Sequence, residues 1–192
     1  MLNKKDLEQL KKELFNYNAK REELIKKSRD IVASSKQLIY AVHRDDLKTA
    51  EQKVKQIEKE KAEIEKIAQA DADLHSEGSF FMALQEYAEA VMYYQFVTKN
   101  KIPTSGELGI CVDSYLGGLA DLTGEVFRRA VYLAGKGDYL AVVKIRDLVE
   151  EIYGELMYFE LKDELRRKFD AIKYDLRKLE DLVLELKLKN KI

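Results

Sequence analysis

Two short segments of the sequence place acidic side chains among apolar and small residues, where acids are rarely found without a role. Glu86 and Glu89 lie in the first segment, and Asp121 and Glu125 lie in the second. The members of each pair are three or four positions apart, so on a helix each pair shares one face, one turn above the other. If the two helices face each other, the four carboxylates converge.

Converging carboxylates need a counter-charge, because they repel one another unless protons or cations neutralise them. Ligation by oxygen alone favours Mg²⁺ or Mn²⁺ over zinc or a redox iron site. Di-iron bundles ordinarily supply Glu-x-x-His pairs, whereas His43 and His75 lie outside both segments here. A hard ion held by carboxylates can activate water and clamp a phosphodiester, as metal-dependent nucleases do. The four acids are therefore candidate metal ligands and catalytic residues.

A structural interpretation of the same acids stays open. Each acid could be partly exposed, or paired with Arg128, Arg129 or lysines of neighbouring helices. Glu89 and Asp121 each have apolar neighbours on both sides, so neither belongs to a polar run. Arg128 and Arg129 follow Glu125 by one turn and are the candidates for phosphate contact; the alternative is that they pair with acids inside the bundle.

The elements that must position these acids are helices. The 192-residue chain is 46% apolar and 36% charged, with one proline and nine glycines, and its charged residues are mostly strong helix formers. Apolar spacings of three and four predict helices over 7–42, 47–67, 80–98, 115–134, 142–153 and 162–188, with a short helical turn near 108–112. Asp45 or Asp46 is the expected N-cap of the second helix, and Asp138 that of the fifth. We expect an all-α bundle of six or seven helices in one domain, 1–192.

The helix predicted over 115–134 contains three interior glycines, Gly117, Gly118 and Gly124, with Asp113 or Ser114 as its expected N-cap. An interior glycine costs a helix about 1 kcal/mol relative to alanine. Three of them indicate that a backbone or a ligand approaches this helix closely.

Charge and cysteine content exclude several classes. The net charge of -1 gives no overall attraction to nucleic acid, although residues 1–70 are mildly basic and residues 71–130 mildly acidic. The single Cys111 excludes a disulfide framework and a cysteine zinc site, and we interpret it as a small buried apolar residue. No signal peptide opens the sequence, and no apolar run reaches the roughly 18 residues of a membrane span, so we expect a cytoplasmic protein.

At the acidic segments the sequence resembles the translin and translin-associated factor X family, as a member of the prokaryotic type. The resemblance is carried by Gln85-Glu86-Tyr87-x-Glu89-Ala90, by Tyr115-Leu116-x-Gly118-x-Ala120-Asp121-Leu122-Thr123-Gly124-Glu125, and by Gly137-Asp138. It extends to Ser28-Arg29-Asp30-Ile31, to Val42-His43-Arg44 and to the region 165–186, so it covers most of the chain.

The resemblance implies a bundle of about seven helices that assembles into a closed, barrel-like octamer around single-stranded nucleic acid. The factor X branch carries a Mg²⁺-dependent endoribonuclease site, whose acids match Glu86, Glu89, Asp121 and Glu125. By that resemblance we expect cleavage of single-stranded RNA, possible binding of single-stranded DNA, and a homo-oligomer. The chain departs from translin before the third helix, where 76–81 lacks an Arg- and His-rich segment. A non-catalytic strand-binding scaffold and a purely helical assembly protein are the competing classes.

Overall fold

The structure is a computed structural model that describes residues 2–192, and those residues form eight helices and no strand. The helices are α1 (Lys4–His43), α2 (Leu47–Ala68), α3 (Ala72–His75), α4 (Gly78–Lys99), α5 (Ser105–Leu108), α6 (Val112–Lys136), α7 (Tyr139–Leu156) and α8 (Asp163–Leu188). The all-α prediction is confirmed.

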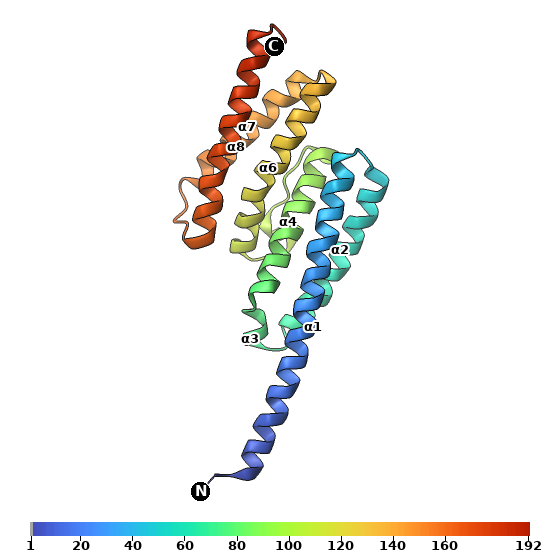
Figure 1. The fold of residues 1–192 in the computed structure, drawn as a ribbon, viewed down its shortest axis with the longest axis vertical. Helices are drawn as coiled ribbons and strands as arrows, with labels where there is room; N and C mark the ends of the chain where they lie inside the picture. Colours follow the sequence, from blue (N-terminus) through green and yellow to red (C-terminus); the bar gives the residue numbers. More distant parts are fainter. Residues whose placement is uncertain (1) are drawn as a thin grey trace.

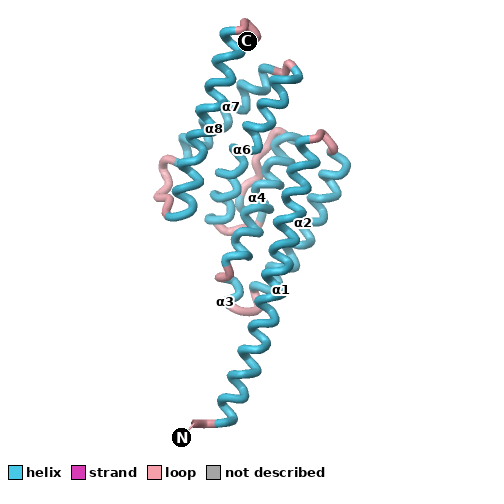
Figure 2. Tube along the Cα trace, viewed as in Figure 1, coloured by secondary structure: helices cyan, strands magenta, loops and turns pink. Residues whose placement is uncertain are grey.

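The long helices lie side by side in an elongated bundle, and α1 extends beyond it at its N-terminal end (Figures 1 and 2). In this bundle α4 packs against α1, α2 and α6, and α6 packs against α4, α7 and α8. Buried residues of α4 lie on all its faces, as its nearly continuous apolar sequence predicts. The two helices that carry the candidate acids are thus the central pair.

A close approach of backbones joins α4 to α6. A Cβ atom added at Gly118 would lie 2.7 Å from the Cβ of Ala88 and 2.9 Å from the backbone nitrogen of Glu89. A Cβ atom at Gly117 would overlap the side chain of Gln85 at 2.3 Å. These two glycines therefore explain the predicted close contact, whereas Gly124 has only an ordinary contact, with Asp175 at 3.7 Å.

The ends of the helices are fixed by local hydrogen bonds. Asp46 caps α2 by accepting from the backbone of Thr49 at 3.1 Å, which confirms one of the two predicted caps. Gly137 ends α6 in the left-handed conformation at φ 85°, and Asp138 caps α7. The predicted Asp138 cap is confirmed.

Three local predictions need correction. Eight helices replace the expected six or seven because the four-residue α3 was not predicted, whereas the short turn expected near 108–112 is present a few residues earlier as α5. Helix α6 begins after Cys111, not after Asp113 or Ser114, since the Ser114 hydroxyl donates to the Phe81 carbonyl at 3.3 Å. Cys111 is exposed at this helix start and is not part of the core.

No helix among the described residues is long and apolar enough to cross a membrane.

The close approach of α4 and α6 leads to a stability prediction. Gly118→Ala should lower the free energy of unfolding by about 1–3 kcal/mol or more, because the new methyl group meets backbone atoms that cannot move independently. Urea denaturation followed by circular dichroism measures the change. Gly135→Ala is the matched control: Gly135 is in the same helix with nothing within 4 Å of the added Cβ, so alanine should leave stability unchanged or raise it. Equal effects at both positions would contradict the account.

Candidate functional site

The packing of α4 on α6 brings the four candidate acids into one electrostatic neighbourhood. Glu86 and Glu89 come from α4, and Asp121 and Glu125 come from α6. Each of the other three acids raises the pKa of Glu89, so all four lie within reach of one another's charge. The four acids of the two helices therefore share one electrostatic environment.

Glu89 is the most deeply placed of the acids, with 9% of its surface exposed. Burial is the main cause that raises the pKa of its carboxyl to about 8, and the charges of Asp121, Glu86 and Glu125 add to the rise. At neutral pH, without a bound cation, this carboxyl is therefore mostly protonated. The negative charge around Glu89 therefore favours a bound proton or a nearby cation.

Glu86 lies one turn before Glu89 and is half-buried. Burial raises the pKa of the Glu86 carboxyl, the ammonium group of Lys36 opposes this rise, and Asp121 adds to it. Glu86 also lines a cleft and so faces solvent more openly than Glu89 does.

Asp121 already has a cationic partner. The Nζ of Lys168, from α8, donates to Oδ1 at 2.8 Å and to Oδ2 at 2.7 Å. The Nε2 of Gln85 also donates to Oδ2 at 2.8 Å. These three bonds orient the Asp121 carboxylate and give it one unit of compensating charge.

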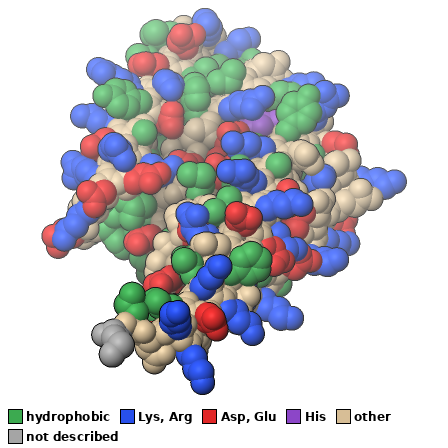
Figure 3. Space-filling model, turned by 60° about the horizontal axis from the view of Figure 1, so that its bottom comes forward, with side chains coloured by type: hydrophobic (Ala, Val, Ile, Leu, Met, Phe, Trp, Pro, Cys, Tyr) green, Lys and Arg blue, Asp and Glu red, His purple; other side chains and the backbone are tan. Residues whose placement is uncertain are grey.

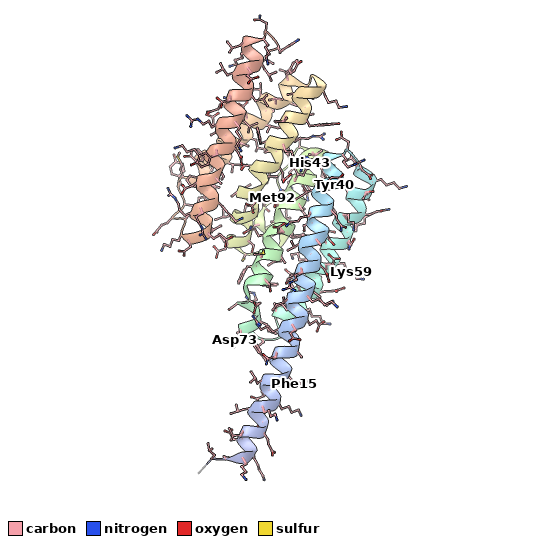
Figure 4. The ribbon with its side chains drawn as sticks, in the orientation of Figure 1. Phe15, Tyr40, His43, Lys59, Asp73 and Met92 are labelled. Carbon is pink, nitrogen blue, oxygen red and sulfur yellow. The ribbon has the colours of Figure 1, made fainter. Side chains whose placement is uncertain are left out.

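Glu125 is held by His43, the last residue of α1. The Nε2 of His43 contacts Oε2 of Glu125, and the hydroxyl of Tyr93 lies 2.9 Å from Nδ1 of the same ring. Burial raises the pKa of Tyr93, so its hydroxyl keeps its proton and can donate to Nδ1. With Nδ1 as the acceptor, the neutral imidazole carries its proton on Nε2, and this N–H donates to Glu125. Figure 4 shows His43 near the C-terminal end of α1, toward α4 and α6.

The chemistry of the donor set fits a hard divalent cation, although its geometry needs adjustment. Among residues 2–192, no three His, Cys, Asp or Glu side chains stand ready to hold a metal ion. Asp121 and Glu125 instead face Lys168 and His43. All four acids offer oxygen ligands, and Glu89 lies in a negative environment that a cation would relieve. The metal and catalytic roles of the four acids stay predictions.

The two candidate arginines differ in their surroundings. Arg129 is mostly buried, and its Nη1 donates to Oδ1 of Asp45 at 2.6 Å. Its guanidinium also lies 5.0 Å from the ring of Tyr132. Arg128 is exposed and forms no ion pair within the described part of the chain. Arg129 therefore matches the alternative in which the arginine pairs with an acid. Phosphate contact stays a prediction for Arg128.

Four further residues contribute to the site that sequence reasoning did not assign to it. Gln85 lies beside Glu86 in the quoted motif, and His43 lies in the Val42-His43-Arg44 motif, so the resemblance includes both residues without giving their roles. Tyr93 is one turn beyond Glu89 on the same face of α4. Lys168 carries no spacing signal that could have marked it.

A cleft of about 790 Å³ opens beside the acids. Gln85, Glu86 and Lys168 belong to its lining, so the acid cluster and the cleft share a wall. On the face shown in Figure 3, Lys and Arg side chains are interspersed with acidic and apolar ones.

Comparison with known proteins identifies the family. The model of the Translin family matches residues 19–190, and the chain therefore belongs to the translin family. The chain is 35% identical over 163 residues to an uncharacterized protein of Methanocaldococcus jannaschii, across 82% of this chain and 72% of that protein. It is 27% identical over 221 residues to Translin-associated protein X of Pongo abelii, across 92% of this chain and 76% of that protein.

Solved structures share the whole fold. Apo-NeC3PO superposes with a TM-score of 0.88 at 31% identity and covers 96% of this chain and 97% of that chain. AfC3PO in complex with duplex RNA superposes with a TM-score of 0.81 at 25% identity, with 96% and 97% covered. The family resemblance seen in the motifs is confirmed along nearly the whole chain.

The raised pKa of Glu89 leads to a pH prediction. Between the unfolded pKa of about 4.5 and the folded value of about 8, the folded protein binds more protons, so the free energy of unfolding falls as the pH rises through this window. In EDTA, Glu89→Gln should remove much of this fall and make the variant more stable than the parent at pH 8.5. The gain should be roughly 2–4 kcal/mol, since one pKa unit corresponds to about 1.4 kcal/mol and relaxation reduces the full value.

Urea denaturation at pH 5.5 and pH 8.5 measures this difference. Glu180→Gln, which removes an exposed acid of α8, should leave the pH dependence of stability as it is in the parent. A parent protein that becomes steadily more stable from pH 5.5 to pH 8.5, with Glu89→Gln behaving identically, would show that Glu89 ionises normally.

Proposed function

We propose that this protein is a Mg²⁺-dependent endoribonuclease that cleaves single-stranded RNA. The observation that carries the proposal is that Glu86, Asp121 and Glu125 act through their charges on the buried Glu89 where α4 packs on α6. Two of these acids are buried or half-buried with raised pKa values, and perturbed carboxyl groups beside a cleft are typical of catalytic sites. Mn²⁺ would serve the same ligand set.

Each acid has a proposed role. Glu89, Asp121 and Glu125 would hold the ion, and Glu86 would bind it through water or orient the attacking water. When bound, the divalent cation supplies positive charge to the phosphate oxygens and makes water a stronger nucleophile. Glu86 suits the water-orienting role because it alone of the four lines the open cleft.

The surrounding residues hold these carboxylates in place. His43 fixes the orientation of Glu125 and is itself fixed by Tyr93, in the manner in which outer hydrogen bonds orient metal-binding groups. Gln85 fixes Asp121 from α4 and so links the two helices at the site. Such preorganisation keeps acids from reorienting when charge develops on a phosphate.

Membership of the translin family and the solved AfC3PO complex with duplex RNA support nucleic-acid binding by this protein. Similarity to Translin-associated protein X over 92% of the chain supports a place near the factor X branch. Single-stranded DNA is a second proposed ligand, because carboxylate-held cations act on phosphates that RNA and DNA share.

We also propose that the chain assembles with copies of itself into an octamer. Four large apolar residues at the N-terminal end of α1 are exposed where this helix leaves the bundle: Leu7, Leu10, Leu14 and Phe15. Leu7, Leu10 and Leu14 recur at steps of three and four, and Phe15 widens the apolar stripe that they form, which another chain can cover. Sedimentation velocity would give the mass of the assembly.

One observation favours a second candidate function, a non-catalytic strand-binding scaffold. Lys168 and His43 already occupy Asp121 and Glu125, so these acids could serve only to fix the packing of helices. A scaffold of this kind would bind RNA in EDTA and leave it intact in Mg²⁺.

The nuclease proposal is tested with Glu125→Gln. This change keeps the shape and the hydrogen bond from His43 but removes one charge from the ligand set, so the rate of RNA cleavage in Mg²⁺ should fall by at least about 100-fold. The assay follows an end-labelled single-stranded RNA on a denaturing gel, with Mg²⁺ and with EDTA.

Glu180→Gln is the control, since it removes an exposed acid far along α8 and should cleave like the parent. Circular dichroism and sedimentation establish that both variants fold and assemble. RNA cleavage by pure Glu125→Gln at the parental rate would remove these acids from the mechanism, and a parent that binds RNA without cutting it would support the scaffold.

A further inference from the structure

The ammonium group of Lys168 is a cation that already stands at the acid cluster. Its Nζ contacts both oxygens of Asp121 at 2.7 and 2.8 Å, and its side chain is 20% exposed. Its charge also reaches Glu86 and Glu89, where it partly offsets the rise of their pKa values. In the cation-free protein Lys168 therefore supplies part of the positive charge that the four acids require.

Lys168 also faces outward, because it lines the cleft together with Gln85 and Glu86. Its side chain therefore contacts both the acid cluster and the cleft. Lys is a compact charge on a flexible stem of four carbons, so it can change partners without a movement of the backbone.

The charges around the cleft restrict where a polyanion could meet it. The remaining charged residues of the lining are four acids and one lysine: Asp113, Glu160, Asp163, Glu164 and Lys162. The Nζ of Lys162 pairs with Glu160 at 3.5 Å. These acids would repel a nucleic-acid backbone, so Lys168 becomes an attractive charge for a phosphate in this cleft only when it leaves Asp121.

A divalent cation on Asp121 would compete with Lys168 for the same carboxylate and would repel its positive charge. An anionic oxygen that arrives with the substrate beside the cation could then receive the released ammonium. We propose that Lys168 is the phosphate-binding residue of this site and that it exchanges Asp121 for a phosphodiester oxygen of a single-stranded nucleic acid when a divalent cation binds. This inference rests on the proposed function.

The first test measures Mn²⁺ binding without RNA. Lys168→Met removes the competing charge, so Mn²⁺ should bind roughly two- to fivefold more tightly, as expected for loss of a partly exposed ion pair. Electron paramagnetic resonance of free Mn²⁺ gives the affinity. Lys178→Met is the matched control, because Lys178 pairs with Asp175 at 3.2 Å on the same helix, and it should leave the Mn²⁺ affinity unchanged.

The second test measures binding of single-stranded RNA as a function of salt, in EDTA and in saturating Ca²⁺, with the strand checked for integrity on a gel. A lost phosphate contact reduces the salt slope of log affinity by about 0.7 for a single strand. Lys168→Met should show this reduction in Ca²⁺ and not in EDTA, where Lys168 stays on Asp121.

Tighter Mn²⁺ binding together with a cation-dependent change of slope supports the exchange. Unchanged or weaker Mn²⁺ binding by folded Lys168→Met, or a slope equal to that of the parent in Ca²⁺, would overturn it.

If Lys168→Met does not fold, Lys168→Arg serves instead: it keeps the charge on Asp121 and should bind Mn²⁺ no more tightly than the parent, and tighter binding would refute the competition. A parent that never cleaves RNA in Mg²⁺ would defeat the proposed nuclease, while the Mn²⁺ affinities would still decide the competition at Asp121.

Discussion

The contact between α4 and α6 is the constraint on which the rest of the structure depends. At Gly118 the two helices approach until no side chain fits between them, with Ala88 and the backbone of Glu89 on the opposite side. That distance decides where the acids of the two helices stand. A wider spacing would let water separate Glu89 from Asp121 and Glu125, and their charges would then hardly interact.

The same contact creates an electrostatic cost that the protein meets in two ways. Glu89 takes up a proton, as its raised pKa indicates, whereas Asp121 and Glu125 receive neighbours from distant helices, Lys168 and His43. Both solutions are reversible, because a proton can leave and a lysine can turn away. The proton on Glu89 and the ammonium group of Lys168 thus offset part of the charge of the acids without a metal ion, and both would be released if the proposed cation bound.

The helices and several caps could be predicted from the sequence because they depend on neighbours along the chain. Apolar spacing indicated each long helix, and the glycines of α6 indicated its close contact. The partners of the acids could not be predicted, since Lys168 is 47 positions from Asp121, and His43 is 82 positions from Glu125. Only the packing of α8 and α1 on the central pair brings them there. The exposure of Cys111 could not be predicted either, because it depends on the position at which α6 begins.

Anomalous diffraction from a crystal grown in Mn²⁺ tests the central claim most directly, because it locates the ion without any assay of activity. The account requires a Mn²⁺ peak between α4 and α6, in contact with carboxylate oxygens of Glu89, Asp121 and Glu125, with the Lys168 ammonium displaced from Asp121. A crystal at saturating Mn²⁺ without a peak at these acids, and with Lys168 still bonded to Asp121, would contradict it.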